Sequence, residues 1–124
     1  MFKSQVSAAT ATGDTTKTLI DTITVPAGVS RIVGIVCQAV GAAIITSGEP
    51  ITGILELESD DVPCVPAQFL LDVVSCLTSG AVAFNPRVWP VDIKVSAGNR
   101  IKGYVTMDMA MTGGLKARFQ LMYE

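Results

Sequence analysis

The 124-residue sequence contains no histidine and few charged residues. Histidine is the commonest general base in enzymes and the commonest metal ligand. Its absence excludes Ser-His-Asp and Cys-His catalytic arrangements within this chain, HExxH zinc sites and the histidine-rich metal site of enzymatic cupins. Charged residues make up 16% of the chain, against about 25% in an average soluble domain. We therefore expect a protein that is not an enzyme, and the low charge needs a physical explanation.

Cysteines are few and are not spaced as metal ligands. The three cysteines, Cys37, Cys64 and Cys76, form no CxxC pair, which makes a zinc site improbable. We interpret them as small buried hydrophobic residues, with a Cys64–Cys76 disulfide as the alternative. The sequence also lacks the phosphate-binding patterns GxxxxGK(S/T) and strand-GxGxxG-helix. We therefore expect neither a metal ion nor a cofactor.

The charges that are present are balanced and scattered. Nine Lys and Arg residues and eleven Asp and Glu residues give a formal net charge of −2. The densest basic pair is Arg100 and Lys102, and the sequence shows no basic stripe that would follow a nucleic-acid backbone. The first residues contain no apolar segment typical of a secretory signal. We expect a soluble protein without a specific nucleic-acid site.

The longest uncharged run lies between Arg31 and Glu49. Its 17 residues reach the lower limit for a membrane helix, and Gly34, Gly41 and Gly48 recur every seven residues like a helix-packing face. The run is rich in Ile and Val, however, and ends in a turn sequence. We therefore favour two buried strands around Gly41 and expect no membrane span.

Abundant Val, Ile and Thr between frequent Gly and Pro turns favour strands throughout the chain. Residues 91–95, 100–111 and 115–123 alternate between apolar and polar side chains, which indicates strands with one buried face. Thr112-Gly113-Gly114 reads as a hairpin connection between the last two. The sequence predicts an all-β protein, an antiparallel β-sandwich of about eight strands.

In the N-terminal half, the alternation between apolar and polar side chains is weaker. Residues 17–25 and 51–58 predict strands, while 31–40 is apolar on both alternating sides and should be covered on both faces. Residues 67–74 fit either a short helix or a buried strand. We expect residues 1–16, rich in Ser, Thr and Ala, to form an extended arm that is ordered only against a neighbour, and residues 17–124 to form a single domain.

Two segments about 70 residues apart resemble each other. Each ends a strand, turns through x-Ala-Gly and begins a new strand with Arg-Ile-x-Gly-x-Val, the glycines of the turns being Gly28 and Gly98. Glycine suits a turn position with positive φ. The echo has two explanations: two similar turns in a β-rich chain, or two related Greek-key halves.

Carboxylates form the only constellations suggestive of chemistry. Glu56 and Glu58 share one side of a strand, as acid–base work on a sugar would need, but their place before a polar turn favours solvated carboxylates. Glu58, Asp60 and Asp61 offer oxygen ligands for calcium, without a DxDxDG pattern. Asp21 falls on the apolar side of its strand, so it either pairs with Arg or Lys or lies at a subunit contact.

The short strands, the x-Ala-Gly turns, the Ser/Thr-rich arm and the chain end on a strand resemble a small single jelly-roll of the kind found in viral coat and capsid-decorating proteins. This resemblance covers most of the chain as a pattern and includes no diagnostic motif. It implies a single jelly-roll that assembles with copies of itself, sometimes with another capsid protein, within a virion. It implies no catalytic residues.

Two functions are therefore expected. The first is a self-assembling structural subunit, because surfaces buried against copies need few charges. Its candidate interface residues are Ile35, Val36, Ile44, Ile45, Trp89 and Tyr104. The alternative is a jelly-roll binding module for carbohydrate or a host surface. Its candidate ligand-binding residues are Trp89, Tyr104, Glu56 and Glu58.

Overall fold

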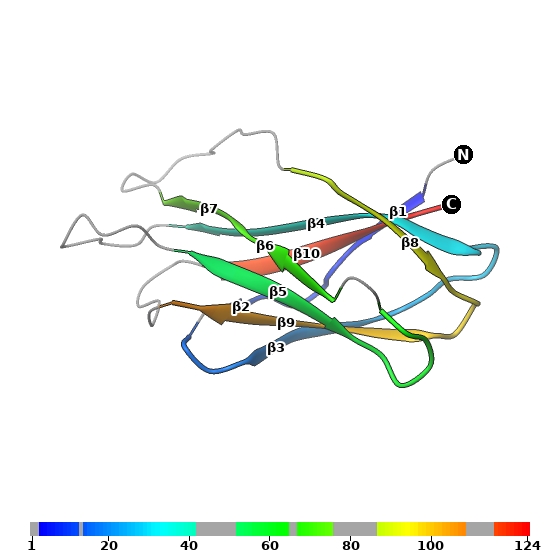
Figure 1. Cartoon of the computed structure of the whole chain (residues 1–124), viewed down its shortest axis with the longest axis horizontal. Coiled ribbons are helices and arrows are strands. Elements are labelled where there is room, and N and C mark those ends of the chain that lie inside the picture. The colour runs from blue at the N-terminus through cyan, green and yellow to red at the C-terminus, as the bar shows by residue number, and fades with distance from the viewer. Residues whose placement is uncertain (1–2, 13, 42–51, 65–66, 76–86, 109–115) are drawn as a thin grey trace.

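The computed structural model describes residues 3–12, 14–41, 52–64, 67–75, 87–108 and 116–124, and it places ten strands and no helix in these ranges (Figure 1). The strands are β1 (Lys3–Val6), β2 (Ala11–Thr12), β3 (Thr18–Thr24), β4 (Arg31–Gly41), β5 (Gly53–Glu58), β6 (Gln68–Leu70), β7 (Asp72–Ser75), β8 (Trp89–Lys94), β9 (Arg100–Met107) and β10 (Lys116–Tyr123). The prediction of an all-β protein is confirmed.

The strands form two sheets around one core. The six-stranded sheet has the order β1-β10-β4-β7, with β2 also beside β10 and β8 beside β4. The four-stranded sheet has the order β3-β9-β5-β6. Buried apolar side chains from both sheets join in a single cluster. The predicted β-sandwich is therefore confirmed, although β7 runs parallel to β4, so the six-stranded sheet is mixed and not purely antiparallel.

The strand order is that of a jelly-roll. β1 and β2 together fill one position beside β10, and β7 and β8 together fill one position beside β4. Numbered in chain order, the eight resulting positions run 1-8-3-6 in one sheet and 2-7-4-5 in the other. Two interlocked Greek keys give this arrangement. The expected number of about eight strands thus matches the eight sheet positions, two of which are each filled by two strands.

Strict alternation of buried and exposed residues builds the core in the C-terminal third. Every second residue of β9 and β10 is buried, as the sequence predicts. These core residues are Ile101, Gly103, Val105, Met107, Ala117, Phe119, Leu121 and Tyr123. The residues between them face outward, so each of the two strands has one apolar face and one wetter face.

β4 is the central strand of the six-stranded sheet, and its register shifts between Ile32 and Gly34. Beyond this shift, Ile35 and Cys37 are buried in the core. Val36 points to the opposite, outer face of the sheet and is still only 7% exposed. Side chains of the strand are therefore buried on both faces, which agrees with its apolar sequence on both alternating sides.

Residues 68–75 form two short strands, so the helix considered for 67–74 is wrong. Phe69 and Leu71 are buried while Gln68 and Leu70 are exposed, which is the period of a strand rather than a helix. The chain passes from the four-stranded to the six-stranded sheet at Leu71. The carbonyl of Leu70 leaves the ladder there and accepts hydrogen bonds from Trp89 Nε1 and Cys37 Sγ, each at 3.1 Å.

The two x-Ala-Gly turns lie against each other at one end of the sandwich. Gly28 and Gly98 have φ angles of 82° and 88°, as the turn sequences predict. The Gly98 N–H donates to the Val25 carbonyl (2.9 Å), and the Val25 N–H donates to the Asn99 carbonyl (2.8 Å). The flanking strands pair crosswise, β3 with β9 and β8 with β4, so the two similar segments lie side by side.

The N-terminal segment pairs with its own chain. β1 and β2 both run antiparallel to β10, and the buried Ser7 hydroxyl accepts a hydrogen bond from the Phe119 N–H between them. Asp21 of β3 binds the bend between β1 and β2. Its Oδ2 accepts hydrogen bonds from the N–H groups of Ala8 (2.8 Å) and Ala9 (3.2 Å). The described partners of Asp21 are thus backbone amides, where we expected Arg, Lys or a subunit contact.

Replacing Asp21 with alanine is expected to loosen the N-terminal segment and to lower the free energy of unfolding by about 1–2 kcal/mol, because two backbone N–H groups lose a charged acceptor. Asp21→Asn keeps one oxygen acceptor and should have a smaller effect. Hydrogen exchange of the Ala8 and Ala9 amides measures the change directly. Unaltered exchange in Asp21→Ala would show that this carboxylate does not hold the segment.

Candidate functional site

The outer face of the six-stranded sheet has a central region without charged side chains. Strand register places Val6, Gln120 and Val36 in one row across β1, β10 and β4. The next row contains Ser4, Met122, Gly34 and Pro90. Together with Val88, which lies beside Gly34, we call these residues the outer band: Ser4, Val6, Gly34, Val36, Val88, Pro90, Gln120 and Met122.

The outer band is apolar and closely packed. Val6 and Val88 are 44% and 47% exposed, and Leu19 and Leu70 on the other sheet are exposed to a similar degree, 47% and 54%. A Cβ atom added at Gly34 would lie 3.0 Å from Val88 Cγ1 and 3.2 Å from Met122 Sδ. Glycine at this position therefore lets the side chains of Val88, which precedes β8, and Met122 of β10 both pack over β4.

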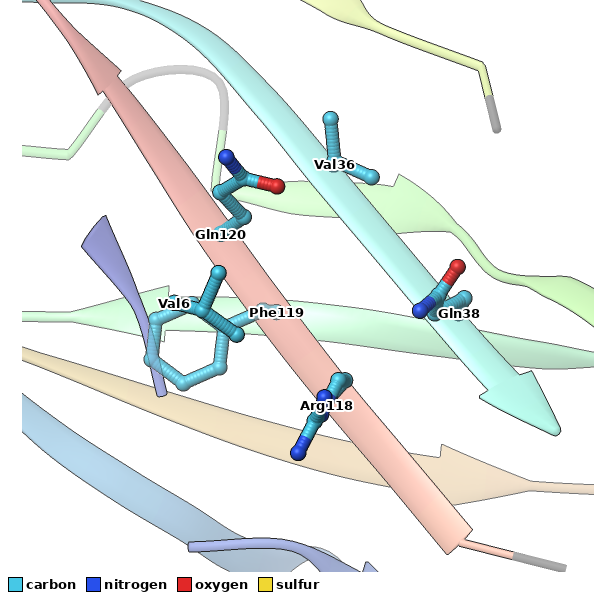
Figure 2. A pocket seen from close by; sticks show the side chains of 6 residues that line it. All are labelled: Val6, Val36, Gln38, Arg118, Phe119 and Gln120. Carbon is cyan, nitrogen blue, oxygen red and sulfur yellow. The ribbon is translucent and has the colours of Figure 1, made fainter. Parts of the chain in front are cut away.

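A small hollow opens at one edge of the outer band (Figure 2). Val36 and Gln38 project into it from β4, and Arg118 and Gln120 from β10. Its volume of about 80 Å³ is well below the roughly 300 Å³ of a typical small-molecule site. The hollow fits a single side chain of a neighbouring molecule better than a ligand.

The outer face of the four-stranded sheet is different, because ion pairs occupy part of it. Lys17 Nζ bonds Glu58, lies 3.4 Å from Glu56 Oε2 and sits 4.6 Å from the centre of the Tyr104 ring. The hydrogen bond to Glu58 raises the pKa of Lys17. Lys102 pairs with Asp60 at 3.9 Å. This face has the charge pattern of an ordinary solvated surface.

The residues predicted for ligand binding do not form one site. Glu56 and Tyr104 are direct neighbours on β5 and β9. Glu58 lies two residues further along β5, on the same face of the sheet. Trp89 belongs to the other sheet, where it packs against the core near Phe69 at a ring distance of 6.5 Å. Trp89 and Tyr104 therefore do not form a joint stacking platform for a sugar.

The predicted interface residues are also spread over the molecule. Val36 lies in the outer band, whereas Ile35 is fully buried and belongs to the core. Ile44 and Ile45 lie outside the described residues. The sequence analysis missed Val6, Val88 and Met122. Met122 had a signal, because it lies on the outward side of the alternation in 115–123, which we had treated as polar, whereas Val6 and Val88 lie in segments without a predicted alternation.

Acidic residues near 56–61 are engaged with the protein itself. The Asp61 carboxylate accepts from the Arg100 N–H at 2.8 Å, and the Ser59 hydroxyl donates to the Arg100 carbonyl at 2.7 Å. Among the described residues, no three His, Cys, Asp or Glu side chains are placed to hold a metal ion. The calcium alternative for Glu58, Asp60 and Asp61 thus gains no support from the geometry.

Two cysteines are described as free thiols. Cys37 is buried in the core and Cys64 is half-buried, while Cys76 lies outside the described residues. Burial, together with the nearby Asp72 carboxylate, raises the pKa of Cys37 to about 12, and burial also raises the pKa of Cys64. Because the thiolate is the reactive form, these positions suit inert core residues, as the sequence analysis interpreted them.

The fold is expected to lose stability above about pH 9. Burial raises the pKa of Cys37 to about 12 from 9.0, and that of Tyr123 to about 12 from 10.0. The unfolded chain therefore releases these protons at lower pH than the folded chain. Stability is therefore complete below about pH 9 and falls between about pH 9 and 12 as these groups titrate. Urea unfolding across this range measures the loss, and Cys37→Ala should reduce the part that begins near pH 9.

Comparisons of the chain with known proteins give no match. No protein-family model matches it, and no curated protein or solved structure gives a significant match. Within the described ranges, no helix is long and apolar enough to cross a membrane. The function must therefore be argued from the two sheet faces.

Proposed function

We propose that this protein is a non-enzymatic structural subunit that assembles with copies of itself through the outer face of its six-stranded sheet. Within that role, the subunit of a virus capsid or a capsid-decorating protein is the form we favour. The jelly-roll order of the strands agrees with it, although the same fold serves many functions.

The contrast between the two outer faces carries the proposal. The face of the four-stranded sheet has paired charges from Lys17, Glu56, Glu58, Lys102 and Asp60. The outer band has no charged side chain and exposes Val6 and Val88. Because interface cores are depleted in charge and single solvated surfaces are not, the outer band is the better contact surface.

The same contrast explains the low charge of the whole chain. On the four-stranded sheet, the outward positions of β5 and β9 include Glu56, Glu58, Arg100 and Lys102. On β4, the outward positions Gly34, Val36 and Gln38 are all uncharged. The uncharged positions are thus concentrated in the middle of this face, between Arg31, Asp92 and Lys94 at one end and Lys116 and Arg118 at the other, and a neighbour that covers the middle buries few charges.

Electron microscopy of the purified protein, together with size determination at low concentration, tests this proposal. We expect particles, rings or another regular oligomer, with a mass above the 13.0 kDa of one chain. A monodisperse species of 13.0 kDa at every concentration would refute self-assembly.

A further inference from the structure

We infer that two copies of this chain stack face to face through their outer bands, related by a two-fold axis that crosses β10 near Leu121. This inference rests on the proposed self-assembly and adds its geometry. The occupant of the outer band is thus a second copy, and the charges at the two ends of the face are what identify it.

Arg118 marks one end of the face. It lies on β10 one row beyond Gln120, is exposed, and lines the hollow of Figure 2. It makes no ion pair within the part of the chain that the structure describes. Its guanidinium is therefore an available cation directly beside the uncharged band.

The other end of the face carries two carboxylates, from Asp92 and Glu124, beside Arg31 and its cross-strand neighbour Lys94. Arg31 lies 3.0 Å from Glu124 Oε2 and 3.6 Å from Asp92 Oδ1. The hydrogen bond to Glu124 raises the pKa of Arg31, and Asp92 adds to this effect. The Glu124 side chain remains 54% exposed, so a second guanidinium can reach it.

A two-fold axis brings these two ends together. Arg118 of β10 and Glu124, the residue that follows β10, lie three residues before and three residues after Leu121. When β10 of one copy lies antiparallel over β10 of the other, Arg118 of each copy faces Glu124 of its partner. A two-fold contact makes this pairing twice. The uncharged rows of the two outer bands then cover each other.

The size of the face predicts a contact of moderate strength. Four strand positions about 4.8 Å apart, each about eight residues of 3.4 Å long, give a face of roughly 500 Å² per copy. Two such faces bury about 1,000 Å², which is the lower limit for a specific interface. The pair should therefore dissociate on dilution and act as one contact within a larger assembly.

Mixing two charge-reversal variants tests the geometry. Arg118→Glu alone and Glu124→Arg alone each place like charges opposite each other twice, so each variant should be at least tenfold weaker in self-association than the wild type. In an equimolar mixture, both contacts of the mixed pair have opposite charges, so association should return. Sedimentation velocity measures all three samples, and native mass spectrometry identifies the mixed pair. Thermal unfolding verifies that each variant is folded.

The matched control is Arg100→Glu, the same substitution at a position 64% exposed on the other sheet, which should leave self-association unchanged. If the wild type associates and the two variants associate equally well, the two-fold geometry is refuted while the proposed function stands. If the variants are weakened but the mixture does not recover, the Arg118–Glu124 pairing is refuted. If the wild type remains monomeric, the proposed function itself fails.

Discussion

Replacing Gly103 with alanine is expected to destabilise the protein by about 3 kcal/mol, the upper range for an overpacked core. Gly103 faces the core from β9, and an added Cβ atom would lie 2.4 Å from Phe119 Cε1 and 2.7 Å from Cζ. Phe119 is only 1% exposed, so its rigid ring has no free space into which it can move. Urea unfolding at neutral pH measures the loss.

Gly98→Ala is the informative comparison for this variant. Nothing lies within 4 Å of a Cβ atom at Gly98, but its φ is +88°, so the substitution has only backbone strain, about 1 kcal/mol. Phe119→Leu should relieve part of the clash, so the double variant Gly103→Ala/Phe119→Leu should be more stable than the sum of the single effects implies. A Gly103→Ala variant within about 0.5 kcal/mol of the wild type would mean that the two sheets are not packed as described.

Replacing Trp89 with alanine is the second large expected effect, a loss of about 3 kcal/mol. The indole packs against the core beside Phe69, and its Nε1–H donates to the Leu70 carbonyl where the chain changes sheets. The variant therefore removes a large apolar side chain and leaves the Leu70 carbonyl with one donor fewer. Thermal and urea unfolding measure the change.

Trp89→Phe separates the two contributions, because it keeps a ring and removes the indole hydrogen bond. We expect it to lower the stability by about 1 kcal/mol. The binding-module hypothesis makes a different prediction, namely that Trp89→Ala folds like the wild type and loses only a ligand. Wild-type stability in Trp89→Ala would therefore favour the binding module and contradict the structural role.

Much of the fold follows from local patterns in the sequence. Residues 100–107 and 116–123 alternate strictly, so their strands and their buried sides follow from the period of two. Gly28 and Gly98 identify their turns because a positive φ favours glycine. Residues 67–74 show no consistent hydrophobic period, so the sequence alone was compatible with a helix there. The structure has two short strands instead, because the chain crosses between the sheets and the strand breaks at Leu71.

The candidate site was less accessible to sequence reasoning than the fold. The uncharged run after Arg31 pointed to β4, but whether a residue faces the core or the outer band depends on the register shift between Ile32 and Gly34. That shift cannot be read from composition. Val6 and Val88 join the outer band only through pairing with distant strands, so tertiary structure alone reveals them.

The hydrogen-bond partners of Asp21 could not be predicted from the sequence either. An acidic residue on the apolar side of a strand signals a buried partner, and the sequence offered Arg and Lys as candidates. The partners are main-chain N–H groups of Ala8 and Ala9. Backbone donors are present at almost every position, so a sequence pattern cannot indicate which of them a carboxylate will bind.

The central claim is that the outer band mediates self-assembly, and a pair of aspartate substitutions tests it most directly. Val88 in the outer band and Leu19 on the other sheet are both 47% exposed, so Val88→Asp and Leu19→Asp add the same charge at equally exposed positions. Sedimentation velocity over a range of concentrations should show that Leu19→Asp assembles like the wild type and that Val88→Asp remains a monomer. Equal assembly of Val88→Asp and the wild type would contradict the account.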